Sequence, residues 1–311
     1  MRRVLVTGGN GFIGSNLISG LSSLPELNVI ATYRENQESL PREKGGAIHC
    51  VHLDVADINE VENIFSDYHF DAVIHTAAFI KDGNDIGVLK SCLEQNVLGT
   101  GNLIEASRGQ GCELFIYCSS ISVYGDIIGG EAVTKEISED DRPSPNSYYG
   151  WSKLSAEELV RVSSESGSMR GISVRLAGTH GPGRKSGVFY TMMRNAHAGR
   201  PLKVMEPASR FRFLFVDDAV DALMKCLLLP IGGNYRCYNV AGDQIFTLAD
   251  LANQIVTYTG SESRVEKTGG ARVRNQVWSI DRIRTEMGFK PKPLRDHIMK
   301  MQEFINVSCL D

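Results

Sequence analysis

A glycine cluster directly after an apolar run near the N-terminus constrains this chain most. The run Val4-Leu5-Val6 leads into Thr7-Gly8-Gly9-Asn10-Gly11, and an apolar helical pattern begins at Phe12. This order predicts a strand, a tight turn and the first turn of a helix. Glycine lets the backbone approach a ligand closely, and a helix N-terminus offers unpaired N–H groups and a positive dipole end to phosphates. The stretch therefore predicts the pyrophosphate-binding turn of a dinucleotide site.

Strand and helix patterns alternate along the first part of the chain. Apolar, β-branched runs recur at 28–34, 48–55, 70–78, 114–118 and 172–176. Helical patterns cover 88–109, 148–166, 188–199 and 293–304. Such alternation is typical of an α/β fold with a doubly wound parallel sheet, the Rossmann arrangement. Beyond Gly178 the pattern changes to turns, short strands and helices, which predicts a smaller C-terminal α/β lobe.

No Pro-rich or Ser-rich linker divides the chain, so we expect that lobe to pack on the first domain. Residues 1–178, with 213–242 returning to them, are expected to form the dinucleotide-binding domain. The remaining residues, 179–212 and 243–311, are expected to form the substrate-binding lobe.

Composition limits the partners. The 311 residues carry a formal net charge of −4, so no basic field predicts binding to nucleic acid or to an anionic membrane. No long apolar run predicts a membrane span, and glycines interrupt the N-terminus where a signal peptide needs an apolar core. The seven cysteines form no CxxC pair, which favours reduced thiols in a cytoplasmic protein and predicts no metal site.

The end of the second strand pattern bears on the choice of cofactor. Tyr33 and Arg34 stand where an NAD enzyme places an Asp or Glu for the adenosine ribose hydroxyls. A guanidinium suits a ribose 2′-phosphate, through paired hydrogen bonds and opposite charge. The sequence therefore predicts NADP. NAD remains the alternative, because Glu35 beside Arg34 could reach a ribose.

The ends of the next two strands suggest where the rest of the cofactor would lie. Asp54 closes the third strand pattern and could accept a hydrogen bond from an adenine amino group, or act as a turn residue. Ala77 and Ala78 close the fourth, and their small side chains would let the cofactor lie close. We expect His75, in the same run, to be a hydrogen-bonded core histidine.

Tyr149 and Lys153 are four apart on a predicted helix and therefore lie on one face. A nearby ammonium and a positive nicotinamide ring would stabilise the phenolate and bring the phenol pKa toward working pH. Tyr149 could then exchange a proton with a substrate oxygen while hydride moves. Ser120, at the end of the 114–118 run, would hydrogen-bond the same oxygen.

Together these motifs resemble the extended short-chain dehydrogenases/reductases of the NAD(P)-dependent epimerase/dehydratase type. The glycines match the spacing G-x-G-x-x-G from Gly9 and the family's variant G-x-x-G-x-x-G from Gly8. The resemblance covers essentially the whole chain and includes the segments Asp54-Val55, His75-Thr76-Ala77-Ala78, Asn96-Val97-Leu98-Gly99-Thr100, Ser119-Ser120-Ile121-Ser122-Val123-Tyr124-Gly125, Tyr149-Gly150-Trp151-Ser152-Lys153, Val216-Asp217-Asp218, Tyr238-Asn239-Val240 and Met287-Gly288-Phe289-Lys290-Pro291.

The resemblance implies a set of site residues. Ser120, Tyr149 and Lys153 would be the catalytic trio. The cofactor would be held by Tyr149, Lys153, Gly8, Gly11, Phe12, Ile13, Gly14, Arg34, Asp54, Val55, Ala77, Ala78 and Asn96. Many members dimerise through the helices that carry the Asn96 and Tyr149 motifs, so a homodimer is expected.

Three departures from the family's pattern narrow the choice of reaction type. Dehydratases of this family place Asp-Glu directly after the catalytic Ser or Thr, and Ile121-Ser122 stands here, so dehydration is not expected. Many sugar-nucleotide epimerases carry an Asn where this chain has Gly178. The family's pyrophosphate-binding Arg falls on Phe211, flanked by Arg210 and Arg212. The strand end at Arg34 resembles that of NADP-using ketone reductases.

We therefore expect an oxidoreductase that acts on a secondary alcohol or ketone, with a nucleotide-linked 4-keto sugar as the substrate class. The alternatives are a nucleotide-sugar 4-epimerase with tightly bound NAD and a reductase of non-sugar ketones, such as a hydroxysteroid-like substrate. A nucleotide-sensing or assembly protein without catalysis is opposed by the intact trio. Candidate substrate contacts are Lys81, Ser122, Arg184, Arg210, Arg212, Arg272 and Arg274.

Overall fold

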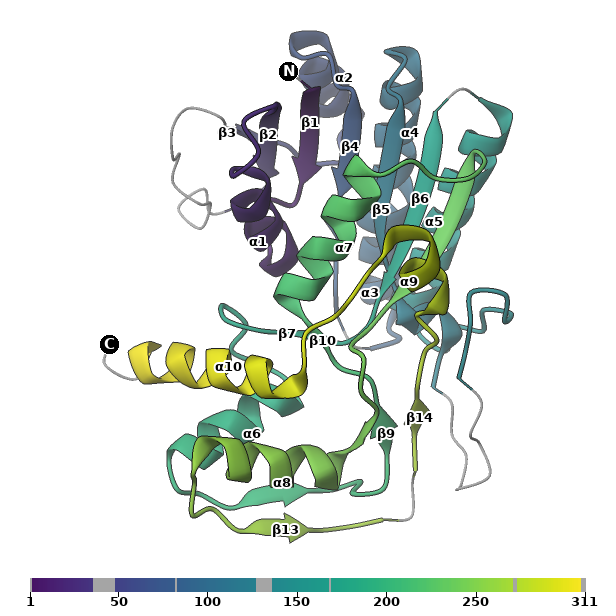
Figure 1. Cartoon of the computed structure of the whole chain (residues 1–311). Helices are drawn as coiled ribbons and strands as arrows, with labels where there is room; N and C mark the ends of the chain where they lie inside the picture. The colour runs from purple at the N-terminus through teal and green to yellow at the C-terminus, as the bar shows by residue number, and fades with distance from the viewer. Residues whose placement is uncertain are drawn as a thin grey trace.

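Figure 1 shows a body with a parallel sheet at its centre and a smaller lobe beyond the carboxyl ends of the sheet strands. The computed structural model describes residues 2–35, 48–81, 83–126, 136–167, 169–270 and 273–308. None of the helices in these ranges combines the length and the apolarity needed to cross a membrane.

Seven strands of the described ranges form one sheet, in the order β11-β6-β5-β4-β1-β2-β3, with each neighbouring pair parallel. The strands are β1 (Arg2–Thr7), β2 (Leu27–Tyr33), β3 (Ile48–His52), β4 (Ala72–His75), β5 (Leu114–Ser120), β6 (Arg170–Leu176) and β11 (Tyr235–Val240). The order reverses between β1 and β4, which opens a crevice at their carboxyl ends. The predicted doubly wound sheet is confirmed.

Helices cover both faces because the central strands are apolar on both sides. In β1, Val4 and Val6 pack with α1 (Phe12–Leu21) and α7 (Val216–Leu228), whereas Leu5 packs on the opposite face. That second face is covered by α2 (Ile58–Asp67), α4 (Gly99–Gly109) and α5 (Tyr148–Ser166). Strands buried in this way read as continuous apolar runs.

One helical rod differs from the sequence prediction. The pattern at 88–109 predicts one regular helix. The structure has α3 (Ile86–Ser91), then a π-helical segment η2 (Cys92–Leu98), then α4. A π-helix has i→i+5 hydrogen bonds, is rare, and occurs most often at functional sites. Apolar spacing does not distinguish it from an α-helix.

The lobe lies beyond the carboxyl ends of the sheet strands (Figure 1). Its core is formed by α6 (Val188–His197), α8 (Leu248–Thr259) and α10 (Leu294–Ser308). Short strands complete it: β7 (Thr179–His180), β8 (Leu202–Val204), β9 (Arg210–Phe211), β10 (Leu214–Phe215), β12 (Phe246–Thr247), β13 (Val265–Lys267) and β14 (Asn275–Gln276). Helix α9 (Asp281–Met287), which sequence patterns missed, returns to β11.

Candidate active site

The glycine turn packs directly on the end of β4. Gly8 has a φ of +69°, and a Cβ there would lie 2.7 Å from the Cα of Ala77. A Cβ on Gly14 would lie 2.1 Å from the carbonyl oxygen of Gly8. Gly11 precedes α1, whose first turn contains no acidic side chain. The turn therefore presents main-chain N–H groups of Phe12, Ile13 and Gly14 to the crevice, which fits a dinucleotide diphosphate.

The residues expected on the adenosine side follow neighbouring strand ends. Arg34 directly follows β2, and Leu53 N, one residue before Asp54, donates to the Tyr33 carbonyl at 2.9 Å. The Arg34 guanidinium is 44% exposed and lies 3.4 Å from the carboxylate of Glu35. Asp54 Oδ1 accepts hydrogen bonds from the main chain of Ala56 and from the Gln95 side chain. An exposed cation beside the crevice is available to a phosphate.

The structure brings the predicted catalytic trio together. Lys153 is buried on α5, and its Nζ donates to the carbonyl of Cys118 at 2.7 Å. Its ammonium lies 6.0 Å from the centre of the Tyr149 ring. Ser120 is close enough to Tyr149 to favour the ionised phenol, and its hydroxyl donates to Ser122 Oγ at 3.0 Å. A hydrogen-bonded pair of serine hydroxyls therefore lies beside Tyr149.

Local sequence explains why α5 meets β5 here. Ser147 caps the helix, and its hydroxyl accepts from the main-chain N–H of Gly150. A Cβ on Gly150 would lie 2.4 Å from the carbonyl oxygen of Ser122. Glycine at this position lets the helix approach the strand end that carries Ser120. The spacing of Tyr149 and Lys153 in the sequence gave no reason for a glycine at position 150.

Burial dominates the electrostatics of the trio. It raises the pKa of Tyr149 to about 12, while the hydrogen bond to Ser120 and the charge of Arg184 act to lower it. Burial also lowers the pKa of Lys153 to about 8. Burial outweighs the groups that favour the phenolate, so the expected shift of the phenol pKa toward neutral pH is not found. The phenol is held as a proton donor.

The side chain of Asn96, a predicted cofactor ligand, is buried and hydrogen-bonded within the protein. It is 1% exposed, and its amide bonds the main chain of Phe79 and the hydroxyl of Ser152. Lys81, in the loop that follows β4, is exposed. His75 is a hydrogen-bonded core residue as expected, 2.6 Å from Thr7 Oγ1. Burial lowers its pKa to about 3, so its ring is neutral.

The candidate substrate arginines fall into three environments. Arg184 is exposed, 6.0 Å from the ring of Phe12, and donates to the Thr179 carbonyl. Arg210 and Arg274 are half-buried on and beside β9, and Arg274 pairs with a Glu206 oxygen at 2.7 Å.

Arg212 is buried, and the structure gives it a different task. It pairs with Glu136 at 2.9 Å and donates to the Trp278 carbonyl. Those bonds occupy much of its donor capacity, so Arg210 and Arg274 remain the better candidates for a diphosphate contact. Arg272 lies outside the described residues.

The sequence did not predict a buried ion pair on the helix that carries Tyr149 and Lys153. Arg175 of β6 makes a bidentate contact with Glu157 of α5, at 2.7 Å for the shorter Nη2 contact, and also bonds the hydroxyl of Tyr124. Glu157 is four residues after Lys153, so both lie on one helix face. The sequence signal for this ion pair was a carboxylate four residues after Lys153 on a predicted helix.

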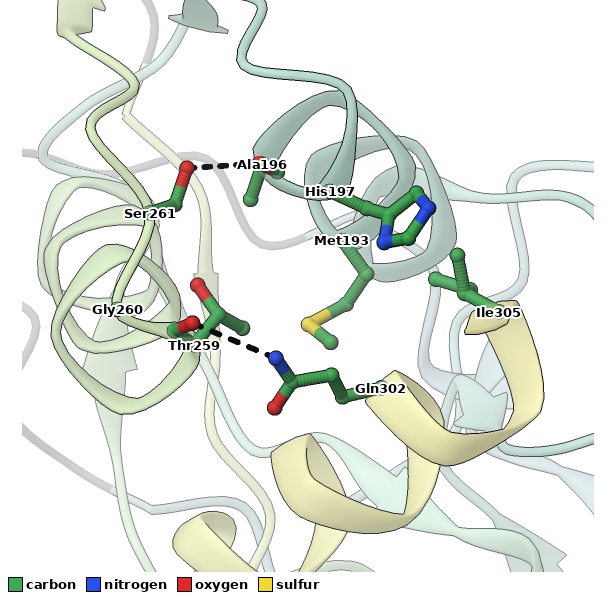
Figure 2. A pocket seen from close by; sticks show the side chains of 8 residues that line it. All are labelled: Met193, Ala196, His197, Thr259, Gly260, Ser261, Gln302 and Ile305. Atoms are coloured by element: carbon green, nitrogen blue, oxygen red, sulfur yellow. Dashed lines mark hydrogen bonds between the residues drawn. The ribbon is translucent and has the colours of Figure 1, made fainter. Parts of the chain in front are cut away.

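A separate cavity of about 210 Å³ lies in the lobe, between α6, α8 and α10 (Figure 2). Ser261 donates to the Ala196 carbonyl and Gln302 to the Thr259 carbonyl along its wall. Its lining includes none of the predicted site residues.

Known proteins match this chain along most of its length. A sequence model of the NAD dependent epimerase/dehydratase family matches residues 4–241. The dTDP-glucose 4,6-dehydratase of Neisseria meningitidis serogroup B is 30% identical, with 94% of this chain and 89% of the relative covered. That of Salmonella typhimurium is 28% identical, with 93% and 88% covered.

Solved structures of similar proteins share this fold. MoeE5 in complex with UDP-glucose and NAD is 26% identical, with a TM-score of 0.83 and 99% of each chain covered. The UDP-glucuronic acid 4-epimerase of Bacillus cereus with NAD has a TM-score of 0.83 at 23% identity, over 98% of this chain and 99% of that one, which shows the shared fold. These findings confirm the predicted enzyme class. The chain belongs to the NAD dependent epimerase/dehydratase family.

Proposed function

We propose that this enzyme transfers hydride between a nicotinamide dinucleotide and a secondary alcohol or ketone of a nucleotide-linked sugar. The observation that carries the proposal is the meeting of Tyr149, Ser120 and Lys153 at the carboxyl edge of the sheet, beside a glycine turn that admits a diphosphate. Residues 1–178 with 213–242 would hold the cofactor, and 179–212 with 243–311 would select the substrate, except for α9 and its flanks, whose Trp278, Ile283 and Phe289 pack in the core around the sheet.

The proposed proton chemistry uses this chain's own residues. Tyr149, kept protonated by burial, donates to the substrate oxygen as it gains negative charge. Ser120, whose hydroxyl bonds Ser122 Oγ at 3.0 Å, orients that oxygen. The positive charge of Lys153 stabilises the phenolate that forms. The bound nicotinamide supplies or accepts the hydride.

We infer NADP as the preferred cofactor. The support is Arg34, an exposed guanidinium directly after β2, where a 2′-phosphate would lie. MoeE5 was solved with NAD, so NAD is the competing cofactor, and Glu35 is the residue that would serve it.

A nucleotide sugar is supported as the substrate class by the relatives, which act on dTDP-glucose or were solved with UDP-glucose. Arg184, Arg210 and Arg274 supply cations that suit a diphosphate. The reaction type rests on the residues after Ser120. Ile121 and Ser122 carry no carboxylate, so elimination of water has no acid at that position. Reduction is therefore placed ahead of dehydration, with 4-epimerisation as the second candidate.

We also propose a homodimer. Trp151, Leu159 and Val162 recur on one face of α5 and are 43%, 38% and 54% exposed. Leu98, at the end of η2, is 60% exposed. A second copy of this face would cover these apolar side chains. Sedimentation at micromolar concentration tests this, and a Trp151→Glu, Val162→Glu variant should be monomeric.

The enzymatic proposal is tested by two measurements on the purified protein. Titration with NADPH, NADH, NADP and NAD, read by nucleotide fluorescence, is expected to show tight and exchangeable NADPH. Products from UDP-linked and dTDP-linked 4-keto sugars and parent sugars are then identified by mass and NMR. Reduction of a 4-keto sugar supports the proposal. Bound NAD that survives purification, with interconversion of C4 epimers, would establish the epimerase instead. Turnover of non-sugar ketones alone would overturn the substrate class.

A further inference from the structure

A histidine–glutamate pair joins the strand ends at the adenosine end of the proposed cofactor site. His52 is the last residue of β3, and its Nδ1 lies 3.1 Å from Oε2 of Glu60 in the first turn of α2. The same carboxylate oxygen accepts from the main-chain N–H of Asp54 at 2.8 Å. Nε2 of the His52 ring lies 3.1 Å from the main-chain carbonyl oxygen of Arg34. The pair therefore contacts both residues that the sequence assigns to the adenosine half, Arg34 and Asp54.

The main chain that leaves β2 is held from two sides. The His52 ring contacts the carbonyl of Arg34, and the Asn10 side chain of the glycine turn donates to the carbonyl of Glu35. The rings of Tyr33 and His52 meet edge-on, with their centroids 5.8 Å apart. The guanidinium of Arg34 is 44% exposed, so its placement depends on how its own main chain is fixed. His52 supplies one of the contacts that fix it.

Both nitrogens of the His52 ring face acceptors. A carboxylate and a main-chain carbonyl offer only lone pairs, and a neutral imidazole has a single N–H. The neutral ring can therefore donate to Glu60 or to Arg34, whereas the doubly protonated ring donates to both. The charged and aromatic groups around the ring are the Glu60 carboxylate from α2, Tyr33 from β2, and the Arg34–Glu35 pair that follows β2. Histidine changes charge between about pH 5 and 8, so both bonds exist together only toward the acid side of that range.

We propose that His52, oriented by Glu60, is a positioning residue that fixes Arg34 for the 2′-phosphate of NADPH, and that it does so only in its doubly protonated form. The protonated ring also adds a positive charge at the end of the site where the phosphate would lie. NADPH affinity should then depend on the protonation of His52. NADH has no 2′-phosphate, so its affinity should depend little on this residue. The inference rests on the proposed cofactor site for its affinity readout.

The first test compares His52→Phe with wild type by fluorescence titration with NADPH and NADH. Phenylalanine keeps a ring against Tyr33 and loses both hydrogen bonds. The control is His69→Gln, an exposed histidine that precedes β4 at the amino end of the sheet, and its main-chain carbonyl keeps its bond from Arg3. A phosphate monoester itself titrates near about pH 6, so the proteins are compared with one another at each pH.

The proposal predicts a loss that is specific for NADPH and confined to acid pH. Near pH 6, His52→Phe should raise the NADPH Kd about 5-fold, which corresponds to about 1 kcal/mol for one hydrogen bond. Near about pH 8.5, where the wild-type ring has one N–H left, the two proteins should agree within about twofold. The NADH Kd should stay within about twofold at both pH values, and His69→Gln should match wild type. Equal losses for NADPH and NADH, or a loss that is the same at every pH, would overturn the proposal.

The role of Glu60 is tested by a double-mutant cycle. Glu60→Gln keeps a side-chain oxygen for the Asp54 N–H and removes the charge that faces His52. Because Glu60 acts on Arg34 through His52, the His52→Phe, Glu60→Gln variant should bind NADPH no more weakly than His52→Phe alone. Additive losses would show that Glu60 acts on the cofactor site independently of His52.

Amide NMR without cofactor tests the contacts themselves. The Arg34 carbonyl and the Glu35 N–H belong to one peptide group, so the Glu35 amide signal should report the bond from the His52 ring. In wild type, a pH titration should move the Glu35 and Asp54 amides along the same curve as the His52 ring signals. In His52→Phe the Glu35 amide should stay constant over that range. A wild-type Glu35 amide that does not follow His52 would refute the contact. Wild type that binds no dinucleotide would refute the proposed function, and the NMR titration would still decide whether His52 holds Arg34.

Discussion

The catalytic edge and the substrate lobe are built in different ways. At the edge, Lys153 is 2% exposed and Asn96 1% exposed, and the hydrogen bonds of this ammonium and this amide go to main chain or to a buried hydroxyl. In the lobe, Arg210 and Arg274 are half-buried beside strands of two residues, β9 and β14. We therefore expect preorganised chemistry at the catalytic edge, and substrate recognition in the lobe by long side chains that can change conformation.

Removing the phenol hydroxyl should produce the largest effect, because it acts within the rigid region. Tyr149→Phe is expected to lower kcat by about 100- to 10,000-fold, the range for loss of a general acid, and to leave cofactor Kd nearly unchanged. Turnover and NADPH fluorescence measure both. The matched control is Tyr148→Phe on the same turn of α5. An active Tyr149→Phe would remove Tyr149 from the mechanism.

Adding one methyl group at each of two glycines tests how closely the glycine turn is packed. Gly14→Ala places a Cβ 2.1 Å from the Gly8 carbonyl oxygen, whereas Gly178→Ala meets no heavy atom of the described residues within 4 Å. Overpacking costs about 1–3 kcal/mol of unfolding free energy, so Gly14→Ala should lose stability and binding of either cofactor. Gly178→Ala should lose neither. Urea unfolding and cofactor titration of both variants check this. Equal losses in the two variants would show that the glycine turn is not the more tightly packed position.

Arg34 stands at the rigid edge but is exposed, so its effect should be intermediate. Losing a charge-assisted hydrogen bond costs about 1.5–3 kcal/mol, so Arg34→Ala should weaken NADPH about 10- to 150-fold and NADH little. Glu35→Ala is the counterpart, because it removes the carboxylate 3.4 Å from Arg34. Equal losses for both cofactors in Arg34→Ala would refute the 2′-phosphate contact. A selective loss of NADH in Glu35→Ala would assign the enzyme to NAD.

Sequence patterns were most informative where function demands one residue type in one backbone position. Gly8 and Gly14 are needed because a Cβ would strike neighbouring main chain, and Tyr149 and Lys153 lie four apart because one helix face carries both. The fold class followed from buried parallel strands such as β1, whose apolar runs are continuous. These are local requirements, so local patterns express them.

The missed features depend on contacts between segments far apart in the chain. The π-helical winding of η2 has the apolar spacing of an α-helix, and the side chain of Asn96 bonds Phe79 and Ser152. The sequence predicts Arg212 as a substrate contact, but the structure buries it in bonds to Glu136 and to the Trp278 carbonyl. No local spacing encodes partners of that kind.

The lobe arginines should therefore separate into a binding residue and a structural one. Arg274→Ala is expected to raise substrate KM by about 10-fold through loss of one phosphate contact, with the unfolding free energy nearly unchanged. Arg212→Ala leaves the Trp278 carbonyl without its donor, so it should cost about 1–3 kcal/mol of stability with a smaller effect on KM. Steady-state kinetics and urea unfolding on both variants decide. The reverse pattern would make Arg212 the diphosphate ligand.

The stability of the catalytic edge itself should depend on pH. Burial lowers the pKa of Lys153 to about 8 in the folded chain, below the value of about 10.4 for an exposed lysine. Between these values the unfolded chain binds more protons than the folded one, so stability rises with pH across that window. In Lys153→Met this rise should vanish, and the variant should be at least as stable as wild type near pH 7 although inactive. Urea unfolding at pH 7.5 and 9.5 tests both statements. If Lys153 lowers stability near pH 7, its charge beside Tyr149 is the reason that the enzyme keeps it. A Lys153→Met variant that loses stability at pH 7.5 would instead make Lys153 a structural residue like Arg212.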